Sequence, residues 1–380
     1  MSRKLVELFL LFLRLGTTAF GGPAAHIAMM EDEVVRRRKW MTRDEFLDLL
    51  GAANLIPGPN STELAIHIGH RQAGWPGLVV AGTSFILPAM LIVMAFAWAY
   101  VRYGSLPQVA GILYGVKPVI IAIVLHALWA LGRTAIKSKF LAVVGVVAVI
   151  LTVLRIHELL VLFGAGLAAV AARTIVRQIK SGLKSLMAAP ALAMLFQTAG
   201  GGAASFGLLP LFLFFLKVGA ILYGSGYVLL AFIRADLVER WHWLTEAQLL
   251  DAIAVGQVTP GPVFTTATFI GYVLGGTRGA LVATLGIFLP AFFFVAVSGP
   301  LVPRIRRSAL AGAFLDGVNV AALALMFVVT YQLGRAALVD FATVGLALIS
   351  TVILFRIRIN SAWLILAGAI VGWFLHSAAS

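Results

Sequence analysis

The sequence contains no cysteine and few charged residues. Without cysteine it forms no disulfide and no thiolate metal site. Only 12% of its 380 residues are charged, 61% are hydrophobic and the mean hydropathy is +1.01, which excludes a soluble globular protein. The 29 Lys and Arg residues outnumber the 15 Asp and Glu, but they are dispersed over short loops with no basic face or tail. This distribution favours anchoring beside anionic lipid over nucleic-acid binding.

Patterns typical of catalytic and metal sites are also absent. His67 and His70 lie three residues apart, but no further His or Cys is near enough to complete a metal site. No glycine-rich loop carries a phosphate-binding lysine. Asp44 and Asp48 share a helix face near an expected helix start, where the helix dipole explains them. We therefore expect no enzyme activity, no cofactor and no metal.

Long apolar runs predict an all-α polytopic membrane protein with roughly ten to twelve membrane segments. Two of the runs are expected to be helical hairpins, turning at Arg155/His157 and at Arg356/Arg358. The runs cover residues 5–30, 77–101, 108–131, 140–172, 208–232, 280–301, 309–333 and 339–376.

The chain is an internal duplication. The stretch Trp40–Asp48 recurs at a constant offset as Trp243–Asp251, and each copy is followed by a Pro-Gly-Pro motif, at 57–59 and at 260–262. The match covers nearly the whole chain, which predicts two homologous helical repeats. We place them at residues 1–185 and 208–380, joined by a linker over residues 186–207. Lys and Arg on alternate loops are nearly balanced, so charge leaves both parallel and inverted orientations open.

Each copy of the motif predicts a broken or re-entrant helix. Thr42 with Glu45, and Thr245 with Gln248, have the spacing of capping boxes and predict helix starts. The prolines of each Pro-Gly-Pro motif stop that helix, and Pro59 and Pro262 are expected to be the first residues of the next one. Half-helices of about 18–21 Å cannot cross a bilayer core of about 30 Å alone. They should therefore end inside the membrane.

A half-helix N-terminus at membrane depth points free N–H groups at a small anion. Polar side chains cluster around both expected termini, and we predict that they bind substrate; the alternative is that they only cap the breaks and bond neighbouring helices. The predicted substrate-binding set is Arg14, Gly22, Asn54, Gly58, Asn60, Ser61, Thr62, Lys117, Lys217, Gln257, Gly261, Thr265 and Thr266.

Three members of this set are cations inside apolar runs. Arg14 and Lys217 occupy the same position in both repeats, and Lys117 lies opposite Asn319 of the second repeat. Each could contact the anion in the protein interior. The alternative for Arg14 and Lys217 is that they extend to the lipid headgroups.

Glu63 and His67 occur only in the first repeat, where their counterparts are Thr266 and Ile270. We predict that Glu63 and His67 couple transport to protons. The alternative for Glu63 is a simple capping carboxylate at the third helical position.

With Gly-Gly-Pro at 21–23, the run at 40–46 and two Pro-Gly-Pro motifs, the chain resembles the chromate ion transporter family in its long, two-domain form. The resemblance implies a multi-pass inner-membrane carrier that exports chromate, driven by the membrane potential or proton gradient, and confers chromate resistance. It also implies opposite orientations for the two repeats. The chain departs from the family pattern at Ser225-Gly226 and at Val263-Phe264.

Other readings remain open. Sulfate is a tetrahedral dianion like chromate, so a sulfate or other oxyanion transporter, including one for uptake, is the main alternative. A membrane enzyme acting on polyprenyl phosphates and a non-transporting scaffold are less favoured. The expected partners are a small oxyanion and the lipid bilayer, with a homodimer as an open alternative.

Overall fold

The computed structural model describes residues 2–20, 22–104, 106–181, 205–223, 228–298, 308–357 and 359–379. These residues form helices and no strand. The predicted linker lies largely outside them, as do Ser225 and Gly226. The helices before the linker are α1 (Arg3–Thr18), α2 (Gly22–Glu31), η1 (Asp32–Arg37), α3 (Arg43–Ala53), α4 (Asn60–Tyr103), α5 (Pro107–Ala135), α6 (Lys139–Val153) and α7 (Glu158–Ser181).

The second part of the chain repeats this order. Among the described residues, α4, α5, α7, α11 and α13 are long and apolar enough to cross a membrane. The helices after the linker are α8 (Leu208–Ile221), α9 (Leu229–Ile233), η4 (Arg234–Arg240), α10 (Glu246–Val258), η5 (Val263–Thr265), α11 (Thr266–Ser298), α13 (Ala309–Ala337), α14 (Phe341–Arg356) and α15 (Ser361–Ala379).

Two of the expected apolar spans are not continuous helices. The run at 5–30 is divided between α1 and α2, and the run at 208–232 between α8 and α9. In each repeat a cap residue with extended backbone ends the first helix, Ala19 after α1 and Leu222 after α8. The two runs predicted as hairpins each divide into two helices near the predicted turns; α6 packs against α7, whereas α14 and α15 both pack against α5.

Both predicted capping boxes are present. The Thr42 hydroxyl accepts from the N–H of Glu45, and the Thr42 N–H donates to the Glu45 carboxylate over 2.8 Å. Thr245 and Gln248 form the same box at the start of α10. Pro59 and Pro262 lie at the cap position, one residue before the helical geometry begins rather than inside it. In the second repeat a short 3₁₀ turn, η5, precedes α11.

The first broken helix is a re-entrant hairpin. α3 runs inward from Thr42 to the Pro-Gly-Pro motif, and the first segment of α4 returns to the same side. Its end is tied there, because Arg71 pairs with Glu45 and the Gln72 amide donates to the Trp40 carbonyl over 3.3 Å. Ala73 and Gly74 then leave helical geometry, and the remainder of α4 reverses direction.

The second repeat forms the same hairpin from α10 and the first segment of α11. Gly275 and Gly276 leave helical geometry at the reversal. A Cβ on Gly275 would lie 3.1 Å from the Phe206 ring, which contacts the Trp243 ring with a centroid distance of 5.3 Å. The hairpin therefore returns to the side on which it began.

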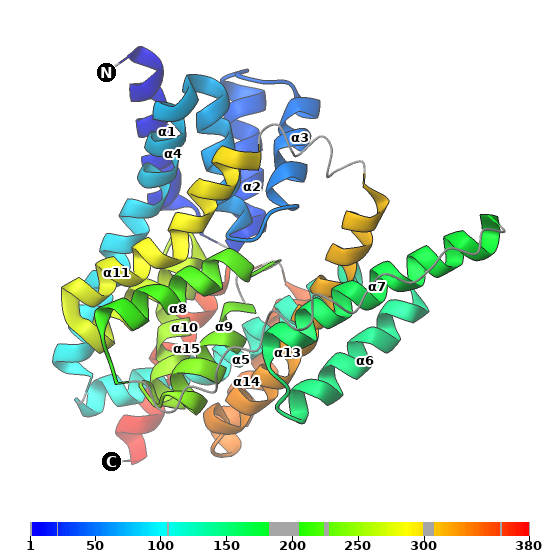
Figure 1. Ribbon diagram of the computed structural model, residues 1–380. Helices are drawn as coiled ribbons and strands as arrows, with labels where there is room; N and C mark the ends of the chain where they lie inside the picture. The colour runs from blue at the N-terminus through cyan, green and yellow to red at the C-terminus, as the bar shows by residue number, and fades with distance from the viewer. Residues whose placement is uncertain are drawn as a thin grey trace.

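The two hairpins enter the membrane from opposite sides. After its reversal at Gly74, α4 runs 26 residues, about 39 Å, to Tyr100. Tyr100 donates to Asp251 on α10 over 2.9 Å and contacts the ring of Phe269 on α11. The far end of the first repeat's spanning helix thus meets the second hairpin, and Figure 1 shows α3 near the top of the molecule and α10 in its lower half. The repeats are inverted.

The helices pack as two groups, each containing helices of both repeats. In the core group α1 packs along α4, α8 packs along α11, α4 contacts α11, and the hairpin helices α3 and α10 pack on α4 and α11. In the flanking group α5 packs against α14 and α15, and α13 packs against α6 and α7. Contacts between the groups are fewer and mostly involve α10. Figure 1 shows α6 and α7 projecting together away from the core group.

Candidate functional site

The tips of the two hairpins meet in the protein interior. The Gly58 N–H donates to the Leu222 carbonyl over 2.8 Å, and the Gly261 N–H donates to the Ala19 carbonyl over 3.0 Å. Each bond joins the Pro-Gly-Pro motif of one repeat to the end of the first helix of the other repeat. These exchanged bonds hold the tip of each hairpin against the other repeat in the protein interior.

The first tip is polar. Asn60, the first residue of α4, donates from its side-chain amide to Asn54 over 2.7 Å. Ser61 Oγ lies 3.3 Å from His26 Nδ1, and His26 Nε2 lies 3.0 Å from the Ala19 carbonyl oxygen. His26 therefore links the α4 N-terminus to the same carbonyl that accepts from Gly261. The Thr62 and Glu63 N–H groups donate to the Pro59 carbonyl over 2.8 and 3.0 Å, so the N–H groups of Asn60 and Ser61 are the ones left without an acceptor within the helix.

Three predicted residues behind this tip are buried. Thr62 and Glu63 have no exposed surface, and the hydroxyl of Thr62 and both carboxylate oxygens of Glu63 have no hydrogen-bond partner among the described residues. His67, one turn along α4, is also buried with Nε2 unpartnered within the described part of the chain. Unpaired polar groups at membrane depth are costly, so they are usually kept for a functional reason.

The second tip is closed by its own hydroxyls. Thr265 donates to the Pro262 carbonyl and Thr266 to the Val263 carbonyl, each over 2.8 Å. Gln257 is half-buried one turn before the break. Thr265 and Thr266 thus have the geometry of the capping alternative, and their contact with substrate stays a prediction.

A cavity of about 750 Å³ opens beside the first tip, between α2, α5 and α13. We call it the Asn54 cavity. Of the predicted substrate residues it is lined by Gly22, Asn54 and Asn60. Its other polar lining residues are His126, Thr134, Lys137, Tyr223, Asp316 and Asn319. Tyr223, which lines the cavity, also lies within electrostatic range of the buried Glu63 carboxylate.

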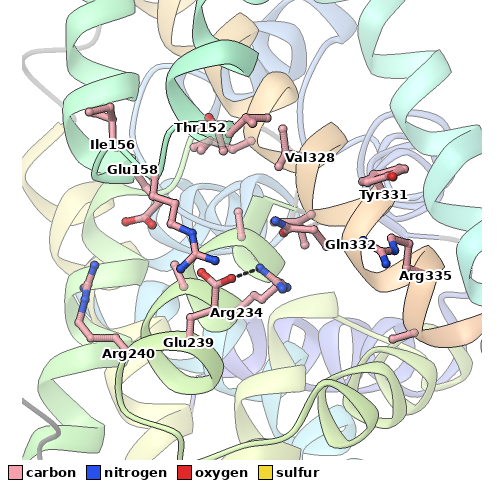
Figure 2. A pocket seen from close by; sticks show the side chains of 17 residues that line it. Thr152, Ile156, Glu158, Arg234, Glu239, Arg240, Val328, Tyr331, Gln332 and Arg335 are labelled. Atoms are coloured by element: carbon pink, nitrogen blue, oxygen red, sulfur yellow. Dashed lines mark hydrogen bonds and ion pairs between the residues drawn. The ribbon is translucent and has the colours of Figure 1, made fainter.

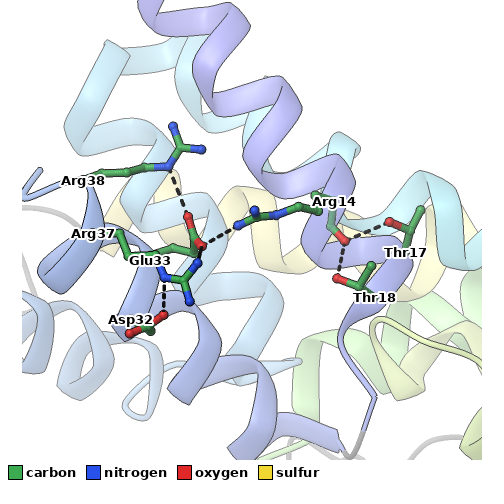
Figure 3. Close-up of polar contacts among 7 residues, drawn as sticks. All are labelled: Arg14, Thr17, Thr18, Asp32, Glu33, Arg37 and Arg38. Atoms are coloured by element: carbon green, nitrogen blue, oxygen red, sulfur yellow. Dashed lines mark hydrogen bonds and ion pairs between the residues drawn. The ribbon is translucent and has the colours of Figure 1, made fainter.

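Arg14 and Lys217 do not line this cavity. Arg14 Nη2 lies 2.5 Å from Glu33 on η1, which also pairs with Arg37 and Arg38, as Figure 3 shows. Lys217 Nζ lies 2.5 Å from Asp236 on η4, which also pairs with Arg240. Both repeats therefore build the same cation and carboxylate cluster on a π-helix, which fixes the first helix of each repeat to the segment that follows it.

Lys117 is paired as well. Its Nζ lies 3.2 Å from Asp251 Oδ1, and Tyr100 donates to the other carboxylate oxygen of Asp251. Lys117 belongs to the flanking group, whereas Asp251 and Tyr100 belong to the core group. The pair is therefore a buried ionic contact between the two helix groups, with Asp251 almost fully buried.

Sequence reasoning missed His26, Glu33, Asp236 and Asp251. Glu33 and Asp236 carry a detectable signal, since they are carboxylates at matching positions of the two repeats. His26 and Asp251 give no such signal, because their partners come from elements distant in the chain. Within the described residues no three His, Asp or Glu side chains group as metal ligands.

Comparison with known proteins matches both repeats. A protein-family model described as "Chromate transporter" matches residues 6–170 and 209–373. The "Chromate transport protein" of Cupriavidus metallidurans is 34% identical over 96% of this chain and 91% of its own length. The protein of the same name in Pseudomonas aeruginosa is 32% identical over 97% and 92%.

A shorter relative matches a single repeat. The "Uncharacterized transporter YwrA" of Bacillus subtilis is 29% identical over 42% of this chain and 92% of its own length. A repeat-sized chain thus exists as a protein by itself. No solved structure matches the chain.

Proposed function

This chain belongs to the chromate transporter family, and from that premise we propose that it is a secondary active transporter exporting chromate across the cytoplasmic membrane. The observation that carries the proposal is the meeting of two inverted re-entrant tips beside the Asn54 cavity. Half-helix ends at membrane depth, held in a duplicated fold, are the usual construction of a substrate site in secondary transporters.

The anion would bind at the α4 N-terminus. Free N–H groups at that helix start, together with the amides of Asn54 and Asn60 and the hydroxyl of Ser61, offer donors to a tetrahedral dianion. Gly22 and Gly58 would let the backbone approach closely. Thr62 supplies a hydroxyl that has no other partner among the described residues. On the second side, Gln257, Gly261, Thr265 and Thr266 would complete the site once the tips separate.

Alternating access would come from movement of the core group against the flanking group. The few contacts between the groups support this division better than a movement of one repeat against the other, because each group contains helices of both repeats. The Lys117–Asp251 pair spans the boundary and would hold one of the two states. Arg14 and Lys217 would act indirectly, by fixing the helices that lead to the tips.

Energisation would involve Glu63, with His67 behind it. A negative carboxylate one turn from a bound dianion is unfavourable, so substrate binding and proton occupancy of Glu63 would be linked. The membrane potential alone would also drive a dianion out of a cell whose interior is negative. Experiments can separate proton coupling through Glu63 from the membrane potential as the driving force.

The main alternative keeps the site and changes the substrate or direction: sulfate or another oxyanion, including uptake. An enzyme acting on polyprenyl phosphates is less favoured, since such chemistry needs an arginine and several carboxylates at the break, where this chain has Glu63.

The deciding experiment is uptake of radiolabelled chromate into everted vesicles containing the protein, with sulfate as competitor and an uncoupler as the control. Export predicts accumulation that the uncoupler abolishes and that sulfate reduces. If labelled sulfate accumulates and chromate does not, the substrate is wrong. If neither anion moves in vesicles shown to contain folded protein, the oxyanion proposal fails.

A further inference from the structure

A second cavity, also of about 750 Å³, lies between the α6–α7 turn, η4 and the C-terminal half of α13. We call it the arginine cavity. Four arginines line it, Arg155, Arg234, Arg240 and Arg335, against two carboxylates, Glu158 and Glu239. Figure 2 shows Gln332 and Arg335 on α13 facing Arg234 and Glu239 on η4. Its lining therefore carries an excess of positive charge.

The surplus charge belongs to Arg155 and Arg335. Arg234 pairs with Glu239 and with Glu246, each over 2.6 Å, and Arg240 pairs with Asp236. Arg155 and Arg335 have no carboxylate within ion-pair distance among the described residues, and both are exposed. Arg155 and Arg335 therefore offer unpaired guanidinium groups to an anion in a cavity whose other two arginines are paired.

Arg155 is held in position by an unusual backbone. Its φ is +60°, in the left-handed region that ordinary residues rarely adopt and that costs about 1 kcal/mol or more outside glycine. Its N–H donates to the Thr152 carbonyl, and the next N–H, of Ile156, donates to Leu151, each over 3.0 Å. Glycine would adopt this backbone without strain, but the turn carries an arginine that lines the cavity.

The two cavities open on opposite sides of the membrane. α4 ends on the side of the second hairpin, so α5 begins there and its C-terminal end, with Lys137, returns to the side of the first hairpin. There Lys137 pairs with Asp316 near the start of α13 over 2.6 Å, beside the Asn54 cavity. The C-terminal end of α13, with Arg335, then lies on the other side. The arginine cavity thus lies on the opposite face from the Asn54 cavity. Both cavities lie at the boundary between the core and flanking groups.

We propose that the arginine cavity is an anion-binding vestibule whose unpaired arginines, Arg155 and Arg335, attract a tetrahedral, multiply oxygenated anion on the face opposite the Asn54 cavity. The anion is either the transported oxyanion or a lipid phosphate. The first case rests on the proposed function. Bound there, the substrate is concentrated at one face before it reaches the hairpin tips, so the vestibule sets the apparent affinity from that face only.

A binding test separates the vestibule from transport. Purified protein in neutral detergent is treated with phenylglyoxal, which modifies free arginine, with and without sulfate, and modification is measured peptide by peptide. Arg133 is the matched control, because it is the counterpart of Arg335 in the last turn of α5 and lines neither cavity. The proposal expects sulfate to slow modification of Arg155 and Arg335 by about tenfold and to leave Arg133 unchanged. Equal protection of Arg133, or no protection, overturns it.

Lipid and free oxyanion are distinguished by repeating the reaction in nanodiscs. Protection without sulfate in phosphatidylglycerol discs but not in phosphatidylcholine discs identifies an anionic lipid, whose phosphate charge is not balanced by choline. Protection that appears only with sulfate in both identifies a free oxyanion. Because this readout needs no transport, it holds or fails independently of the proposed function.

Transport then tests the role of a free-oxyanion vestibule. In reconstituted vesicles of defined orientation, an R155Q/R335Q variant should raise the chromate KM by about tenfold or more when the arginine cavity faces the substrate, with kcat retained. From the other face its KM should match that of wild type and of the R133Q control. An equal KM change from both faces would contradict a vestibule and indicate damage to the central site.

Discussion

The two repeats share a backbone and differ in their chemistry. Their Pro-Gly-Pro glycines, Gly58 and Gly261, both have positive φ, and the residues before the two tryptophans, Lys39 and His242, share φ values of +52° and +53°. Both repeats carry a π-helix and a reversal at the same relative place. Backbone geometry of this detail, repeated in inverted orientation, is what two equivalent states of one transporter require.

The side chains around the tips are not equivalent. The first repeat presents titratable and hydroxyl groups, whereas the second presents apolar groups or hydroxyls already bonded to their own turn. The contrasting pairs are His26 with Leu229, Ser61 with Phe264, Glu63 with Thr266 and His67 with Ile270. Duplication thus preserved the backbone geometry in both halves, whereas the buried titratable side chains near the tips, His26, Glu63 and His67, belong to the first.

The largest expected effect is a difference in stability between alanine substitution at Gly58 and at Gly261. Substituting alanine strains both, because φ is +136° at Gly58 and +90° at Gly261. At Gly58 the new Cβ meets the movable end of Glu63, whereas at Gly261 it meets Ala89 Cβ at 2.8 Å and the Gly16 carbonyl at 3.0 Å. We expect G261A to lose about 2–5 kcal/mol of stability and G58A less. Thermal unfolding in detergent measures both, and an equal loss would show that strain alone decides.

A smaller effect tests the ionic contact between the groups. Lys117 and Asp251 form a buried pair, whereas their counterparts in the opposite repeats are Asn319 and the exposed Asp48. K117M leaves the Asp251 carboxylate with only the Tyr100 hydrogen bond and should cost about 2–3 kcal/mol. Unfolding temperature and chromate flux are the readouts.

The control for K117M is K137M, which breaks the more exposed Lys137–Asp316 pair and should cost under about 1 kcal/mol. A K117M/D251N double variant should recover part of the stability lost in K117M, because no carboxylate is left unpaired. Equal losses in K117M and K137M would mean that the pair between the groups has no special energetic role.

Features that depend on residues close in the chain are predictable from the sequence, whereas features that depend on contacts between distant residues are not. Thr42 with Glu45, and the prolines that end α3, act within one or two turns, so the caps and breaks were predicted to within a residue. The sequence left open whether each helix is broken or re-entrant, because the return of the first hairpin depends on the reversal at Gly74 and on Arg71 meeting Glu45 across 26 positions.

The site divides in the same way. Asn54 and Asn60 lie close in the chain, and in the structure their side chains form a hydrogen bond at the first tip. Arg14 and Lys217 were assigned to the anion because their carboxylate partners lie 19 residues away, beyond any local pattern. The exchanged bonds between Gly58 and Leu222, and between Gly261 and Ala19, join the two repeats and leave no mark in either repeat alone.

Substitution of Glu63 by glutamine should change transport more than stability. E63Q makes the first tip permanently neutral, as the second tip is at Thr266. We expect chromate flux to persist and its pH dependence to disappear, so the slope of log rate against pH falls from about one toward zero. In wild type the rate should fall as pH rises, because fewer Glu63 carboxyls hold a proton beside the dianion.

The matched control for E63Q is T266S, at the corresponding position of the second repeat, which should retain the wild-type profile. An E63Q variant with undiminished pH dependence would remove Glu63 from the coupling mechanism and leave the membrane potential as the drive.

The smallest expected effect tests an ion pair whose charges are exchanged between the two repeats. Glu31 pairs with Arg43 over 3.4 Å in the first repeat, and at the same positions of the second repeat Arg234 pairs with Glu246 over 2.6 Å, with the charges exchanged. E31R alone should cost up to about 1 kcal/mol by repulsion, and E31R/R43E should return to within about 0.5 kcal/mol of wild type in thermal unfolding. Recovery would mean that the fold accepts either polarity. A double variant as unstable as E31R would instead show that the fold requires the charge order of the first repeat at this contact.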